Sequence, residues 1–301
     1  MKLLENFDPA WQRMVGQLFK PFDLKRWFLL GFSAFLAVLF GGGTRFNFRR
    51  VYSPGKDQAA FYDTWGPEVW FIVIGVAFIV ALVLFILLTW LGSRGQFMLL
   101  DNVVKGAAEV RAPWKQYQAL AQSLFILWIK ISGGAFVVLL IVVGAGAASY
   151  FLVPASERSL LYYVPLGLGL LVVIAFCVII GVAMFFLREF GVLWMYRHGG
   201  TAEAAALKVF QLARDNPADF LCYLLIRLVM GIVFFIISLL LGLLTCCLGF
   251  LPYLRSVTNL PLTVFRVWYS IECFAQLGPD CDVRSENPPP IPLIEPPPIG
   301  P

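Results

Sequence analysis

The sequence predicts an all-α integral membrane protein, a polytopic transmembrane helical bundle of about six spans with interfacial amphipathic helices. Hydrophobic residues make up 60% of the 301 positions and charged residues only 14%, whereas a typical soluble protein carries about 25% charge. Several apolar runs also reach the roughly 20 residues that a helix needs to cross a bilayer. These runs lack the short alternating pattern of barrel strands, so a helical bundle is the expected fold.

The N-terminal segment predicts a short helix over residues 9–19 that lies in the membrane interface. Asp8 is a good N-cap, and Pro9 suits the first helical position. Apolar residues then recur at helical spacing between Trp11 and Leu18, with polar residues opposite them. Because no small-residue cleavage site follows the first apolar run, we expect the first span to remain in the mature protein.

Six apolar runs are predicted to cross the membrane, within a membrane domain that covers residues 1–279. The basic and aromatic group Lys25-Arg26-Trp27 anchors the start of the first run. The predicted spans lie at about residues 27–42, 69–91, 123–145, 163–186, 220–243 and 257–275. The tail, residues 280–301, ends in a mostly proline stretch that favours extended backbone, so we expect the tail to be disordered.

Two loops between the predicted spans are expected to hold amphipathic helices. Within residues 94–110, apolar residues fall on one arc of a helix, and polar residues that include Asp101 and Asn102 fall on the other. Thr201 can cap the second helix, which continues to Asp215. Both loops therefore predict helices that lie along the membrane surface.

A weak internal repeat relates two parts of the chain. Residues 125–140 superpose on residues 222–237 at a constant offset of 97, and Lys130 then corresponds to Arg227. Because each copy follows one of the two amphipathic helices, the unit of span, interfacial helix and span is predicted to occur twice.

The distribution of lysine and arginine favours a cytoplasmic location for both termini. Outside the spans, fourteen of these residues lie on the side of the termini and six on the other, and cytoplasmic loops carry such an excess. The basic first loop is the one feature that opposes this orientation. Both loop helices would then lie at the cytoplasmic face, where basic residues meet anionic lipid headgroups.

Three basic residues inside the predicted spans, Lys130, Arg227 and Arg266, form the candidate anion- or lipid-binding site. A charge within the bilayer is costly, so it indicates function by default. Lys130 and Arg227 lie near the cytoplasmic ends of their spans, from which long side chains can reach the interface, whereas Arg266 lies near the middle of a short span. Glu189 and Glu203 are candidate acidic partners. The sharper hypothesis groups the three cations into a pocket, open to the inner leaflet, that suits a lipid phosphate or another anion.

No motif in the sequence indicates a catalytic residue, a cofactor or a metal site. His198 is the only histidine, which excludes multi-histidine metal sites, and the sequence has neither a Gly-x-Ser-x-Gly elbow nor a phosphate loop. The six cysteines lack histidines at ligand spacing and are expected to be small buried hydrophobes. A Ser-His-Asp arrangement around His198 stays open as an alternative. We therefore expect a protein that is not an enzyme, uses no cofactor and binds no nucleic acid.

Several motifs resemble those of an uncharacterised family of bacterial multi-pass membrane proteins. They are Leu18-Phe19-Lys20-Pro21-Phe22, Arg94-Gly95-Gln96-Phe97-Met98, Leu260-Pro261, Val264-Phe265-Arg266, Tyr269-Ser270 and Gln276-Leu277-Gly278-Pro279. The resemblance covers nearly the whole membrane part and implies a location in the bacterial inner membrane. The chain is similar, more distantly, to the membrane domain attached to some glycerophosphodiester phosphodiesterases. It shows no trace of their catalytic barrel, so the resemblance does not imply their activity.

We expect a non-enzymatic membrane component that binds membrane lipids, or a protein partner, through its cytoplasmic face. The alternative is a small-solute or lipid transporter, in which glycines of the spans would allow close helix packing or helix breaks. The glycines concerned include Gly133, Gly134, Gly144, Gly167, Gly169 and Gly181.

Overall fold

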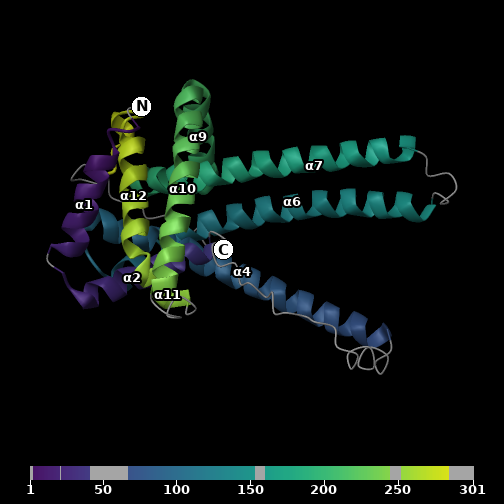
Figure 1. The fold of residues 1–301 in the computed structure, drawn as a ribbon, viewed down its shortest axis with the longest axis horizontal. Helices are drawn as coiled ribbons and strands as arrows, with labels where there is room; N and C mark the ends of the chain where they lie inside the picture. The colour runs from purple at the N-terminus through teal and green to yellow at the C-terminus, as the bar shows by residue number, and fades with distance from the viewer. Residues whose placement is uncertain (1–2, 21, 41–66, 153–159, 245–251, 285–301) are drawn as a thin grey trace, which may run out of the picture.

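Every regular element is helical in the part of the chain that the computed structural model describes, namely residues 3–20, 22–40, 67–152, 160–244 and 252–284. The predicted all-α fold is thereby confirmed. The helices are α1 (Phe7–Phe19), α2 (Leu24–Phe40), α4 (Pro67–Lys105), α5 (Arg111–Gln116), α6 (Gln118–Leu152), α7 (Leu160–Phe186), α8 (Val192–His198), α9 (Ala202–Asp215), α10 (Pro217–Leu244), α11 (Pro252–Thr258) and α12 (Leu260–Ala275) (Figure 1). The proline stretch of the tail and the predicted first loop lie outside the described residues.

Four of the described helices are long and apolar enough to cross a membrane. They cover Val69–Lys105, Gln118–Gly146, Gly167–His198 and Pro217–Leu243. In the most apolar stretch of each helix, at most 17% of the residues are buried inside the protein. Side chains such as Phe71 and Leu171 are 77% and 63% exposed. Because soluble proteins rarely expose apolar surface on this scale, the fold is compatible with a membrane protein whose lipids cover these helices. The second to fifth predicted spans coincide with them wholly or in large part.

The helices at the predicted first and sixth spans are shorter. α2 has 17 residues and α12 has 16, or roughly 24–26 Å at 1.5 Å per residue, against about 30 Å for a hydrocarbon core. Between α11 and α12, the side chains of Thr258 and Asn259 donate hydrogen bonds to the carbonyl of Arg255, and such bonds compete with helix continuation. Pro261 then lies in the first turn of α12. That α2 and α12 cross the membrane stays a prediction.

The buried core lies where α1, α2, α12 and the C-terminal part of α4 meet, and it extends over residues 186–196 to α9 and to Phe220 and Tyr223 of α10. α2 runs antiparallel to that part of α4, and a Cβ atom at Gly95 would overlap Leu36 and the backbone of Ala37. Only glycine permits this approach of two backbones. α1 packs on α12, where the indole of Trp268 donates a hydrogen bond of 3.0 Å to the side chain of Gln17. α6, α7 and the first half of α4 extend away from this core (Figure 1).

Two of the predicted amphipathic helices are present. α1 covers the predicted helix at residues 9–19 and buries Met14 and Leu18 in the core. Trp11 of the predicted apolar face is instead 57% exposed, and Gln17, expected on the polar face, is buried. α9 begins as predicted, because the hydroxyl of Thr201 accepts a hydrogen bond of 3.3 Å from the backbone N–H of Ala204. In α9 the apolar residues Leu207 and Phe210 are 65% and 67% exposed. An exposed apolar face is typical of a helix that lies in a membrane interface.

The predicted separate helix at residues 94–110 is wrong. Residues 94–105 continue α4, which ends before Gly106, where φ is +63°. The predicted polar arc is also solvated only in part. Asp101 is only 3% exposed, and its carboxylate accepts hydrogen bonds from the hydroxyls of Tyr117 (2.8 Å) and Tyr196 (2.9 Å). Helical periodicity misled here because part of the polar arc, Asp101 and Asn102, is buried by hydrogen bonding, whereas Lys105 and Glu109 of the same arc are exposed.

Candidate anion-binding site

A π-helical turn, Leu187–Gly191, joins α7 to α8. Such turns add one residue to a helical turn and occur frequently at functional sites. This one carries the adjacent charged residues Arg188 and Glu189. Their side chains bond to α2, α10 and α12, so the turn lies where the long helices meet the core.

Glu189 is the centre of a hydrogen-bonded cluster. Its Oε1 atom accepts from the guanidinium of Arg227 on α10 and, at 3.3 Å, from that of Arg266 on α12. Its Oε2 atom accepts from the hydroxyls of Ser270 (2.7 Å) and Tyr223 (3.4 Å). The side chains of Arg227 and Glu189 are 4% and 11% exposed, whereas that of Arg266 is 45% exposed. One carboxylate therefore connects three helical elements, and one of its two arginines stays accessible.

Positive charge exceeds negative charge in this cluster. Arg188 donates one hydrogen bond of 3.3 Å to the backbone carbonyl of Ala37 on α2, and within the described residues its guanidinium forms no ion pair. Two guanidinium groups thus pair with the single carboxylate of Glu189, and the guanidinium of Arg188, which has no acidic partner there, lines the same cavity. Buried charge is stable only when it is paired or hydrogen-bonded, so the arrangement favours an anion.

A cavity of about 120 Å³ opens onto these groups. Arg188, Glu189, Arg227 and Arg266 line it together with Gln96 of α4, and we call it the arginine cavity. Gln96 is only 7% exposed, yet both its amide oxygen and its amide nitrogen lack a hydrogen-bond partner in the described part of the chain. At about 30 Å³ per water molecule, the volume suits a group of roughly four heavy atoms.

The structure brings together two of the three cations that the sequence singled out. Arg227 and Arg266 meet on Glu189, one of the two predicted acids. Lys130 lies elsewhere, in an exposed ion pair of 2.6 Å with Glu203, the other predicted acid. Whether any of them binds an anion stays a prediction.

Sequence reasoning missed Arg188 and Gln96. Arg188 is one of the fourteen lysines and arginines that the sequence places outside the spans on the side of the termini. It follows the fourth predicted span by two residues, where the helix continues. Gln96 lies in one of the motifs that carry the family resemblance, five residues after the second predicted span, but no ligand was assigned to it. A search for polar residues just beyond each span would have found both.

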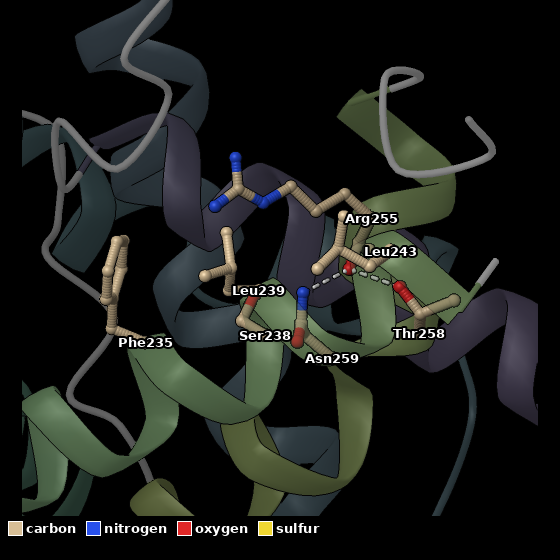
Figure 2. A pocket seen from close by; sticks show the side chains of 8 residues that line it. Phe235, Ser238, Leu239, Leu243, Arg255, Thr258 and Asn259 are labelled. Carbon is tan, nitrogen blue, oxygen red and sulfur yellow. Dashed lines mark hydrogen bonds between the residues drawn. The ribbon is translucent and has the colours of Figure 1, made fainter. Parts of the chain in front are cut away.

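A second cleft, of about 260 Å³, lies between α10 and α11. Figure 2 shows its lining, with Phe235, Ser238, Leu239 and Leu243 from α10 facing Arg255, Thr258 and Asn259. The Thr258 and Asn259 side chains already bond to the Arg255 carbonyl. The guanidinium of Arg255 is exposed to solvent, so this cleft offers fewer constrained polar groups than the arginine cavity.

The residues considered for catalysis or metal binding are dispersed. His198 ends α8, is exposed, and stacks on Trp194 with ring centroids 3.8 Å apart. Within the described residues, no group of three or more histidines, cysteines or acids could hold a metal ion. Cys273 and Cys281 are buried as predicted. Cys177 and Cys222 are instead exposed, because they lie on the outward faces of the long helices α7 and α10.

Comparison with family models yields a match that supplies no function. A model described as a family of unknown function (DUF7544) matches residues 1–274, which confirms an uncharacterised family. The bacterial origin, the multi-pass membrane nature and the likeness to the phosphodiesterase membrane domain stay predictions. No curated protein and no solved structure matches the chain. The role of the arginine cavity therefore has to be argued from its own geometry.

Proposed function

The chain belongs to this family of unknown function, and we propose that it is a non-enzymatic membrane component that binds an anionic group, such as a lipid phosphate, in the arginine cavity. The observation that carries the proposal is the excess of charge, since three arginines line the cavity and only two of them pair with its one carboxylate. Guanidinium donors match phosphate and carboxylate oxygens in geometry and charge. An anion bound there would compensate the remaining positive charge.

Membrane lipids are the proposed partners. The long helices expose apolar surface along most of their length, so lipid would surround the molecule. Arg266 is half exposed, which supports access to the cavity from outside the bundle. A protein partner at the cytoplasmic face, near the exposed apolar residues of α9, is the second kind of partner that we propose.

The proposed location is a bacterial inner membrane, with several spans and both termini in the cytoplasm. The lysine and arginine distribution supports the orientation, and the family resemblance supports the location. Membrane-impermeant maleimide tests it on intact cells, in a variant that lacks the six native cysteines. A cysteine at position 255 should react, whereas one at position 111 should react only after lysis. The opposite pattern would reverse the proposed topology.

The direct test of function compares lipid retention by Arg266→Gln and wild type in native mass spectrometry. Arg266 is half exposed, so the substitution removes charge from the cavity without leaving a fully buried gap. The matched control is Arg255→Gln, which removes an exposed arginine from the second cleft. We expect an anionic phospholipid to be retained by wild type and the control and lost from Arg266→Gln. Equal retention by all three proteins would refute the proposal.

The transport hypothesis has less support. Added Cβ atoms at Gly133, Gly134, Gly144, Gly167, Gly169 and Gly181 would meet nothing within 4 Å. Among the described residues, these glycines therefore do not mediate the close helix packing that the hypothesis assigns to them. Flux of a solute in proteoliposomes would nevertheless restore transport as the better interpretation.

A further inference from the structure

Two polar side chains that line the arginine cavity have buried atoms without a hydrogen-bond partner among the described residues, namely Arg227 at its Nε atom and Gln96 at both ends of its amide. Gln96 is 7% exposed, and neither end of its amide has a partner there. Because both ends are free, exchanging the amide oxygen and nitrogen would not alter this conclusion. The neighbouring Gly95 holds α4 against α2, which fixes the backbone of Gln96 at the cavity wall. A ligand that bonds to both ends of the amide would relieve the cost of its burial.

The amide oxygen of Gln96 determines what the ligand has to offer. The guanidinium groups of Arg188 and Arg266 are donors only, so they suit the oxygens of a phosphate, and the Gln96 amide nitrogen can donate to the same oxygens. The amide oxygen can only accept. The ligand must therefore contribute an N–H or O–H group of its own. Glu189 does not take up this donor, because both its oxygens already accept hydrogen bonds.

Charge decides between the two kinds of donor. An ammonium group would enter a cavity in which three guanidinium groups face one carboxylate, and like charges at close range repel. A hydroxyl group is neutral and meets no such repulsion. The cavity volume of about 120 Å³ has room for a phosphate with its nearest substituent, rather than for the 300–1,000 Å³ of a drug-sized ligand.

We propose that the arginine cavity selects phosphate esters that carry a free hydroxyl group close to the phosphate. This inference rests on the proposed anion-binding function and names its ligand class. The arginines bind the phosphate, and the Gln96 amide donates to a phosphate oxygen while accepting from the hydroxyl. A hydroxylated lipid headgroup and a soluble hydroxylated phosphate ester share this chemistry.

The experiment compares two lipids of equal charge and identical acyl chains, phosphatidylglycerol, which has headgroup hydroxyls, and phosphatidylmethanol, which has none. Both are offered at equal concentration to the detergent-purified full-length protein, and retention is measured by native mass spectrometry. We expect wild type to prefer phosphatidylglycerol by about tenfold, the effect of roughly one unsatisfied buried hydrogen bond. In Gln96→Leu the ratio should approach one. Retention of both lipids should fall, because the amide donor to the phosphate is lost, but retention of phosphatidylglycerol should fall further, because it also loses the acceptor for its hydroxyl group.

Soluble competitors distinguish the two sources of the ligand. Displacement of phosphatidylglycerol by glycerol 1-phosphate, and not by methyl phosphate, would support a soluble hydroxylated ester as the ligand. A preference among lipids with no displacement would support a lipid headgroup. Equal retention of both lipids by wild type would overturn the hydroxyl inference and leave anion binding intact. This comparison needs no variant, so it holds even if Gln96→Leu fails to fold. Retention of neither lipid would instead overturn the proposed function.

Discussion

Substituting Glu189 by glutamine removes the only carboxylate that the arginine cluster contains. The substitution preserves the size of the side chain and one carbonyl oxygen, so it changes charge with little change in packing. Arg227 would then lie buried, at 4% side-chain exposure, with no acid in contact among the described residues. We expect the folded state to lose stability because an uncompensated buried charge is left behind.

The size of the effect follows from the burial of each partner. Breaking a buried ion pair costs about 3–5 kcal/mol, and Arg227 with Glu189 qualifies as such a pair. The contribution of Arg266 is discounted, because its side chain is 45% exposed and solvent screens the interaction. The glutamine oxygen can still accept one hydrogen bond. We therefore expect a loss of about 3 kcal/mol in the free energy of unfolding, at the lower end of the range.

Denaturant titration in a single detergent measures this loss, and the chain contains its own control. Glu203 pairs with Lys130 at the surface, where both side chains are at least 60% exposed, so Glu203→Gln should cost less than about 1 kcal/mol. The double variant Glu189→Gln, Arg227→Met should recover much of the stability, since it removes the unpaired charge itself. Equal losses of stability in Glu189→Gln and Glu203→Gln would refute the buried-pair argument. So would a loss in the double variant equal to the sum of the losses in Glu189→Gln and Arg227→Met.

Two further predictions concern packing and pH. Gly95→Ala should lower the unfolding temperature because a Cβ atom there overlaps Leu36 and Ala37. The control Gly134→Ala, whose Cβ atom meets nothing within 4 Å, should be neutral or stabilising. Equal effects of the two substitutions on the unfolding temperature would contradict the close approach of α4 and α2. Burial, with the Asp280 carboxylate as a smaller contribution, raises the pKa of the Cys281 thiol to about 11 from an ordinary value of 9.0. The unfolded chain therefore releases this proton first, so the stabilisation is complete below pH 9 and is lost as the pH rises from 9 to 11. Cys281→Ala should flatten that part of the stability curve, and an unchanged curve would contradict the assignment.

The sequence predicts the long helices well and the site only in part, for a physical reason. Twenty apolar residues in a row have few structural outcomes, so the four long helices follow from composition alone. Charged and polar residues have more outcomes. Asp101 looked like part of a solvated helix face but is buried against two tyrosines, and Arg188 looked like a loop charge but belongs to a π-helical turn. Their partners come from other helices, and no local pattern encodes such contacts.

The two ion pairs within the long helices show what the predicted repeat can and cannot explain. Lys130 on α6 and Arg227 on α10 occupy corresponding positions, and each bonds to a glutamate between α7 and α10. The acids do not correspond, because Glu189 lies on the π-helical turn and Glu203 in the first turn of α9. The residue types fit their surroundings. Arginine, with a planar group that hydrogen-bonds on several sides, occupies the buried position, and strongly hydrated lysine occupies the exposed one. A common origin of the two cations would thus leave the arginine cavity unexplained, because the π-helical turn, Arg188 and Gln96 distinguish it from the pair on α6.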